Sequence, residues 1–319
     1  MFKFKNLLLL ALTTTTLFSA SVIKPSKQFD ADGAVIDIVV SNDNIYTSTD
    51  VSVVDIFDLN SFKKKKSITL PKIKDFMGDT IDAKIYSVDV LKDEILILSQ
   101  GEHGFRNVDI YKNGKLNSVI SIKDKLYIAK TKFLNDHTIL LGLLSNDIIS
   151  YNIKTKKQNW TIQASGSKFS NFVLNEDKSE VVVCDESGDL KIIDTKNGKI
   201  KKILSGKNLD NVFQADYKNH IIITAGQDRR SVVYNLKTDS SYYKTANFLI
   251  YSAGLSPSGK IGAYASDENN NVTLFNTQTK SKIGVFGENK MTISNILFLN
   301  EKEFFITSDD DTINYYKLK

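Results

Sequence analysis

Short apolar runs separated by polar turns recur along the chain from residue 36 onward. Each repeat opens with a short strand-like segment, passes through a strongly apolar run and a third segment, and ends with a lysine-rich hairpin and a fourth segment. In the clearest repeat the expected strands are residues 171–174, 180–184, 190–194 and 200–204. The Asn197-Gly198 pair in its last turn favours a two-residue type I′ hairpin. The pattern predicts four antiparallel strands per repeat.

Seven repeats of this kind follow one another. The first covers residues 36–70, and the others start near residues 87, 129, 170, 211, 252 and 294. Four strands in about 40 residues is the period of a propeller blade. The seventh repeat ends after three strands, which would leave an unpaired edge. We expect residues 22–33 to supply the missing outer strand, so the sequence predicts an all-β, seven-bladed β-propeller closed by its N-terminal strand, with residues 22–319 as one domain.

The end of the third strand resembles the WD40 repeat, in which this position carries a Trp-Asp pair. The corresponding pairs in this chain are Phe57-Asp58, Tyr151-Asn152, Ile193-Asp194, Tyr234-Asn235 and Phe275-Asn276. The Gly-His pair and the Trp of the standard repeat are absent from every unit. The resemblance therefore implies a WD40-like fold without the hydrogen-bond network of standard WD40 blades.

The first residues are typical of a signal peptide. Lys3 and Lys5 precede an apolar stretch at residues 7–18, and Ser19-Ala20-Ser21 offers small residues for cleavage. We expect residues 1–21 to be removed near Ala20 or Ser21 and the propeller to be periplasmic. An uncleaved N-terminal anchor is the alternative, and no stable membrane insertion of the propeller is expected.

Composition and charge narrow the possible partners. The only cysteine, Cys184, lies in the apolar run 180–184 and is expected to be buried. The formal net charge of +5 falls by two once Lys3 and Lys5 are removed. That charge is too small to indicate nucleic-acid binding.

The segment 98–108, Leu-Ser-Gln-Gly-Glu-His-Gly-Phe-Arg-Asn-Val, resembles part of the NapL family of accessory proteins of periplasmic nitrate reductase systems. That family has a signal peptide, no lipid anchor and a WD40-like propeller of similar length. The resemblance implies a periplasmic helper of a molybdenum-containing nitrate reductase, and it carries over no catalytic residues.

The sequence offers no motif for catalysis, metal binding or a cofactor. It contains no nucleophile elbow and no phosphate-binding loop. The three histidines lie in different repeats, and residues 309–311 lack the remainder of a calcium loop. We therefore predict no catalytic residues, no metal ligands and no cofactor. A lactonase-like or other small-molecule or metal-dependent enzyme that uses the central channel remains as one alternative, and a ligand-binding sensor remains as another.

The three arginines are the candidate binding residues. Arg106, Arg229 and Arg230 all lie at the turn between the second and third strands of a repeat, and His103 and Glu102 share the loop of Arg106. Arginine offers a planar set of donors suited to carboxylates and to interface centres. We expect these residues to contact acidic groups of a protein partner. The alternative is a structural link to a carboxylate such as Asp228 or Glu102.

These turns also carry many acidic residues, whereas the turns between third and fourth strands carry mostly lysines. The sequence therefore predicts one acidic face containing the arginines and one basic face. The overall prediction is a monomeric, non-enzymatic propeller scaffold that binds a protein partner, with components of a periplasmic nitrate reductase as the candidate.

Overall fold

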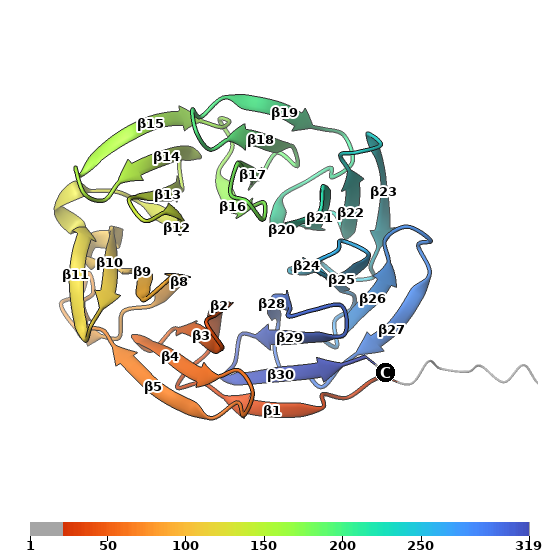
Figure 1. The fold of residues 1–319 in the computed structure, drawn as a ribbon, viewed down its shortest axis with the longest axis horizontal. Helices are drawn as coiled ribbons and strands as arrows, with labels where there is room; N and C mark the ends of the chain where they lie inside the picture. The colour runs from red at the N-terminus through yellow and green to blue at the C-terminus, as the bar shows by residue number, and fades with distance from the viewer. Residues whose placement is uncertain (1–21, 319) are drawn as a thin grey trace, which may run out of the picture.

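Seven four-stranded antiparallel sheets surround a central axis in the computed structural model (Figure 1). The structure describes residues 22–318, and the predicted signal peptide at residues 1–21 lies outside the described residues. In blades 1 to 6 the chain starts at the axis and moves outward strand by strand before it enters the next blade. The predicted seven-bladed, all-β architecture is confirmed.

The first four blades follow the chain in order. Blade 1 contains β2 (Val35–Ser41), β3 (Asn44–Thr49), β4 (Val53–Asp58) and β5 (Lys64–Thr69). Blade 2 contains β8 (Ile85–Leu91), β9 (Glu94–Gln100), β10 (Arg106–Lys112) and β11 (Lys115–Ile120). Blade 3 contains β12 (Ile128–Asn135), β13 (Thr138–Leu143), β14 (Asp147–Asn152) and β15 (Lys157–Gln163). Blade 4 contains β16 (Phe169–Leu174), β17 (Glu180–Asp185), β18 (Leu190–Asp194) and β19 (Ile200–Leu204).

The remaining elements complete the ring. Blade 5 contains β20 (Val212–Lys218), β21 (Ile221–Gly226), β22 (Arg230–Asn235) and β23 (Ser240–Thr245). Blade 6 contains β24 (Ala253–Leu255), β25 (Ile261–Ala265), β26 (Val272–Asn276) and β27 (Lys282–Phe286). Blade 7 contains β28 (Ile293–Phe298), β29 (Glu303–Ser308), β30 (Thr312–Lys317) and, from the other end of the chain, β1 (Lys27–Asp30). A small hairpin of β6 (Ile73–Lys74) and β7 (Thr80–Ile81) links blades 1 and 2, and two short 3₁₀ turns occur at Glu102–Gly104 and Ile122–Asp124.

The hydrophobic core lies between adjacent blades. Every residue of β13, in the middle of blade 3, is buried. One core cluster joins Leu96 and Leu98 of blade 2 to Phe133 and Ile139 of blade 3. Since each blade buries both of its faces against neighbours, the sheets are stable only as a closed ring.

The N-terminal segment closes that ring. β1 pairs antiparallel with β30, with Lys27 opposite Tyr315 and Asp30 opposite Thr312. The Phe29 ring stacks on Phe62 of blade 1 at 5.1 Å between centroids. The predicted closure is therefore confirmed for residues 27–30.

The residues just before β1 extend the closure to a third blade. The Ile23 amide donates to the Val285 carbonyl at 2.7 Å, and the Gly287 amide donates to the Ile23 carbonyl at 3.0 Å. These bonds place Ile23 along the outer edge of blade 6, not in blade 7 as predicted. The N-terminal segment thus ties together blades 6, 7 and 1.

The third-strand residues that resemble the WD40 pair have a clear structural role. In five blades the Asp or Asn at this position accepts backbone hydrogen bonds from the next turn. Asp194 Oδ1, for example, accepts from the amides of Lys196 at 2.9 Å and Asn197 at 3.2 Å. The predicted type I′ turn is wrong, because only Gly198 has a positive φ, 73°. The Asp194 side chain supports a wider turn instead.

Polar side chains on the innermost strands also join neighbouring blades. Asp89 Oδ2 of blade 2 accepts the Phe133 amide of blade 3 at 2.7 Å. Asp216 Oδ2 of blade 5 accepts the Leu255 amide of blade 6 at 2.9 Å. These carboxylates satisfy backbone donors on the innermost strands, which are the edges of their sheets and have no further strand to pair with.

The closure can be tested at Phe29, whose ring contacts blades 1 and 7. We expect Phe29→Ala to lower the free energy of unfolding by about 2–4 kcal/mol, because it removes a packed aromatic ring at the junction. The exposed Lys115→Ala in β11 is the control and should change stability by less than about 0.5 kcal/mol. The measurement is equilibrium denaturation of both variants, and equal, small effects would contradict this role of β1.

Candidate interaction face and channel

The alternating strand directions divide the loops between two faces. The first face carries the turns between second and third strands and the loops between blades. We call it the arginine face, and it consists of residues 31–34, 50–52, 70–84, 101–106, 121–127, 144–146, 164–168, 186–189, 205–211, 227–230, 246–252, 266–271, 287–292 and 309–311. The opposite face carries the turns between first and second and between third and fourth strands, and we call it the lysine face.

Arg106, the first residue of β10, is tied to its own blade. Its guanidinium lies over the Tyr86 ring at 4.2 Å from the centroid. Nη1 donates to the carbonyl oxygens of Gly104 and Phe105, the latter at 3.1 Å. Arg106 therefore holds the loop 101–105 in place. It does not pair with Glu102, which was one expected structural partner.

The other two arginines differ from each other. The Arg230 guanidinium lies over Tyr243 at 4.5 Å, donates to the Lys207 carbonyl at 3.0 Å, and has Nε 3.9 Å from Asp228 Oδ2. The structural alternative considered for Arg230 thus matches its contacts. Arg229 is exposed, has a φ of 63°, and makes no side-chain hydrogen bond or ion pair within residues 22–318. It is the arginine that a partner can reach most freely.

His103 and Glu102 occupy the 3₁₀ turn at the tip of the blade 2 loop. His103 is exposed with a φ of 56°, and Glu102 is half-buried. Both lie in the blade 2 loop that leads into Arg106, whereas Arg229 and Arg230 lie in blade 5. The five candidate residues thus share one face but form two separate groups.

Apolar side chains on this face give a signal that the sequence reasoning missed. In the part of the chain that the structure describes, every exposed large hydrophobic residue in a loop between two strands lies on the arginine face. They are Phe76, Met77, Tyr127, Leu209, Phe248 and Met291. The other exposed large hydrophobic residues lie in the N-terminal segment or on the outer strands. The lysine face carries none within residues 22–318.

Aromatic pairs strengthen this difference between the faces. Phe105 and Tyr127 lie 4.8 Å apart between centroids, in the loops on either side of blade 2's third and fourth strands. Phe213 and Tyr251 stack at 5.1 Å near the start of the inner strands of blades 5 and 6, with Phe248 beside Tyr251. Aromatic residues and arginine are the residue types that dominate the energetic centres of protein interfaces.

The acidic character of this face is partly structural. Asp185 is fully buried and its Oδ2 accepts hydrogen bonds from Lys191, Asn146 and Ser165 at 2.6, 2.9 and 2.7 Å. It does not face solvent as the turn pattern predicts. The exposed carboxylates Asp50 and Glu186 and the half-buried Asp189 remain on the surface of the arginine face.

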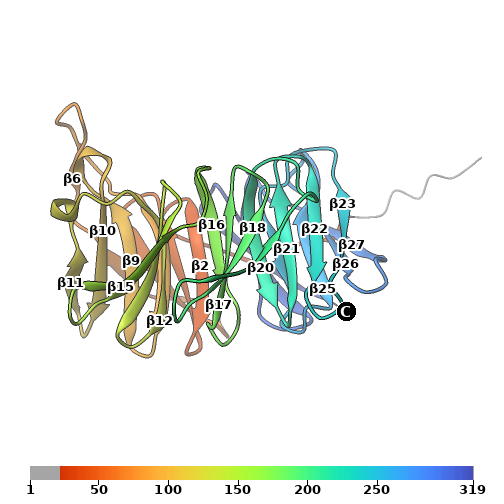
Figure 2. The same cartoon turned by 90° about the horizontal axis from the view of Figure 1, so that it is seen from above.

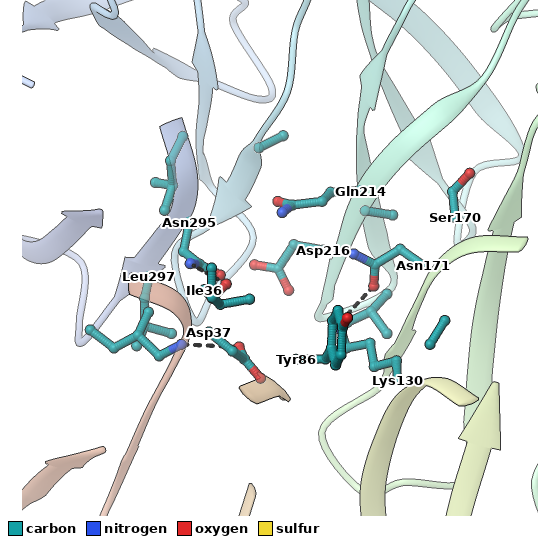
Figure 3. A pocket seen from close by; sticks show the side chains of 16 residues that line it. Ile36, Asp37, Tyr86, Lys130, Ser170, Asn171, Gln214, Asp216, Asn295 and Leu297 are labelled. Atoms are coloured by element: carbon teal, nitrogen blue, oxygen red, sulfur yellow. Dashed lines mark hydrogen bonds between the residues drawn. The ribbon is translucent and has the colours of Figure 1, made fainter. Parts of the chain in front are cut away.

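The central channel contains a cavity of about 350 Å³ lined by the innermost strands of all seven blades (Figure 3). The strand registers place Asp37, Ser87, Lys130, Asn171, Gln214, Ala253 and Asn295 at equivalent positions of these strands. All of them except Ser87 line the cavity. This polar ring follows from the strand register and was not recognised in the sequence.

Two lysines in the channel have different surroundings. Lys132 Nζ lies 3.0 Å from Asp37 Oδ2 and donates to the Val88 carbonyl at 2.7 Å. Lys130 Nζ donates to Asn171 Oδ1 at 2.6 Å but has no carboxylate partner among residues 22–318. Burial, together with the charge of Lys132, lowers the pKa of Lys130 to about 8. Lys130 is therefore a half-buried ammonium group that faces a cavity.

Residues 22–318 also bear on metal binding, on the cysteine and on membrane-spanning helices. No group of three or more His, Cys, Asp or Glu side chains is close enough to bind a metal within this range. Cys184 is buried as predicted, and burial raises the pKa of its thiol to about 12. No helix in the described range is long and apolar enough to span a membrane.

Comparison with known proteins supports the fold alone. No protein-family model and no curated protein matches the chain. Among solved structures, a chain of the "Crystal Structure of Mitotic Checkpoint Complex" has a TM-score of 0.73 at 14% identity, covering 100% of this chain and 98% of that chain. The chain is thus a WD40-like seven-bladed propeller. Because 1843 solved chains match it, the fold by itself selects no function.

The contacts of the arginines predict different effects of the same substitution. Arg106→Lys should lower the free energy of unfolding by about 1–2 kcal/mol, because lysine cannot both stack on Tyr86 and reach two carbonyl oxygens. Arg229→Lys should change it by less than about 0.5 kcal/mol. Denaturant titration of the two variants measures this, and an unchanged midpoint for Arg106→Lys would show that Arg106 does not hold its loop.

Proposed function

We propose that this protein is a non-enzymatic, periplasmic scaffold that binds a protein partner through its arginine face and assists a periplasmic nitrate reductase. A rigid ring of blades that presents many independent loops suits protein binding. The signal-peptide pattern at residues 1–21 supports the compartment, and the resemblance of residues 98–108 to the NapL family supports the nitrate reductase system.

One observation carries the choice of face. The exposed hydrophobic loop residues gather on the arginine face, where the aromatic pairs and Arg229 also lie. Exposed apolar groups surrounded by polar residues mark interaction sites. We expect the partner to place an acidic group opposite Arg229, while the exposed carboxylates of the same face favour basic residues around its apolar pockets.

The β6–β7 hairpin is the most prominent apolar element of this face. Phe76 is 89% exposed and Met77 is 73% exposed at its tip, and the hairpin extends beyond the body of the disc (Figure 2). Asp75 Oδ1 accepts the amides of Met77 at 2.8 Å and Asp79 at 2.9 Å. Gly78 has a φ of 88°, which this tight turn requires.

This turn is organised before any partner binds. The Asp75 amide also donates to the Asp79 carbonyl at 3.0 Å, and Lys74 Nζ donates to Thr80 Oγ1 at 2.6 Å across the hairpin. An ordered loop loses little conformational freedom on binding. The hairpin is therefore suited to insert Phe76 and Met77 into an apolar pocket of the partner.

The double variant Phe76→Ser/Met77→Ser tests this proposal. We expect it to weaken association with the purified periplasmic nitrate reductase at least tenfold, because it removes the exposed apolar anchor. Its stability should stay within about 0.5 kcal/mol of the unmodified protein, since neither side chain is buried. Calorimetry or surface plasmon resonance measures the association.

The matched control is Ile203→Ser, which removes an exposed apolar side chain from the outer strand β19 and should leave binding unchanged. Normal binding by the double variant would contradict the assignment of the arginine face. Failure of the unmodified protein to bind the reductase would instead contradict the choice of partner.

A further inference from the structure

The central cavity presents positive and negative groups from different blades. Lys130 and Asn171 come from blades 3 and 4, whereas Gln214 and Asp216 come from blade 5 and Asn295 from blade 7. Figure 3 shows these side chains around the same cavity. The arrangement therefore offers hydrogen-bond donors on one side and acceptors on another.

The donor side has unused capacity. The Lys130 ammonium carries three protons and gives one to Asn171 Oδ1. The Asn171 amide nitrogen makes no hydrogen bond within residues 22–318. A half-buried ammonium without an ion-pair partner is partly desolvated, which costs free energy that a bound carboxylate would offset.

The acceptor side has unused capacity as well. Asp216 accepts one backbone amide on each oxygen, Tyr217 at 2.8 Å and Leu255 at 2.9 Å, so each oxygen can accept another donor. Lys218 Nζ lies 3.6 Å from Asp216 Oδ1 on the partly exposed side. The side-chain oxygens of Gln214 and Asn295 accept no hydrogen bond from residues 22–318, whereas the amide nitrogens donate to the backbone carbonyl groups of Ser294 and Ile36.

These charges favour a ligand that carries both signs. A plain anion at Lys130 would lie near the carboxylate of Asp216, and a plain cation at Asp216 would lie near the ammonium of Lys130. A small molecule with both charges satisfies both sides. The cavity of about 350 Å³ is at the small end of ligand pockets, which suits a molecule of amino-acid size.

We propose that the central channel binds a small zwitterion of the α-amino acid class. Its carboxylate contacts Lys130 and the Asn171 amide, and its ammonium contacts Asp216 with the side-chain oxygens of Gln214 and Asn295. Ile36, Tyr86 and Ser170 line the cavity next to the arginine-face loops, so the ligand enters from that face.

The test uses the mature protein and the twenty proteinogenic amino acids, each at about 10 mM, in thermal-shift and calorimetric assays. We expect at least one to raise the melting temperature and to give a measurable heat of binding. For that amino acid, the decarboxylated amine and the deaminated acid should each bind at least tenfold more weakly. Absence of binding by every amino acid, or equal binding by either analogue, would overturn the proposal.

Variants locate the site independently. Lys130→Met and Asp216→Asn should each weaken binding at least tenfold, while Lys123→Met, at an exposed position of the arginine face, should not. Asn171→Ala leaves Lys130 in place and serves if Lys130→Met does not fold. Unchanged affinity in both Lys130→Met and Asp216→Asn would place the ligand elsewhere and contradict the channel site. If Lys130→Met does not fold, Asn171→Ala replaces it in this comparison.

Discussion

Closure of the ring is the constraint on which the rest of the structure depends. Each blade buries apolar side chains on both of its faces, so an open ring would expose the faces of two blades at once. The C-terminal blade contains only three strands from its own repeat, and β1 supplies the fourth. Phe29 then packs against aromatic rings of blades 1 and 7, which joins the first and last repeats through one cluster.

Closure also decides which surfaces can bind partners. The blade faces are buried and the outer strands form the rim, so the loops of the two faces are the surfaces left to vary. On the lysine face, Asp and Asn side chains hold the third-to-fourth strand turns through backbone hydrogen bonds. The arginine face carries the longer loops, the extra hairpin and the exposed apolar residues. The two faces thus have different physical roles within one fold.

The sequence predicted most of the architecture because alternation and turn residues are local signals. The strands of blade 4 agree with the expected ranges to within two residues at either end. The type I′ turn was wrong because the Asp194 side chain, three residues before Asn197, stabilises a wider turn. The stacking of Arg106 on Tyr86 joins β10 to β8, which lie apart in the sequence, so no local sequence pattern predicts it.

The polar ring of residues around the channel could not be recognised from the sequence, because it depends on which residue of each inner strand faces the axis. A bulge near the start of most of these strands shifts the register by one residue. The β6–β7 hairpin did leave a sequence signal: the interval between the first and second repeats is long and contains Phe76-Met77 between Asp75 and Gly78.

Amide hydrogen exchange of the protein with and without the purified reductase tests the assignment of the arginine face, because it reports which face a partner covers. We expect added protection in the arginine-face loops, above all in residues 72–82 and 227–230. We expect no change in lysine-face turns such as residues 195–199. Protection of the lysine-face turns, with the hairpin and the loop of Arg229 unchanged, would contradict this assignment.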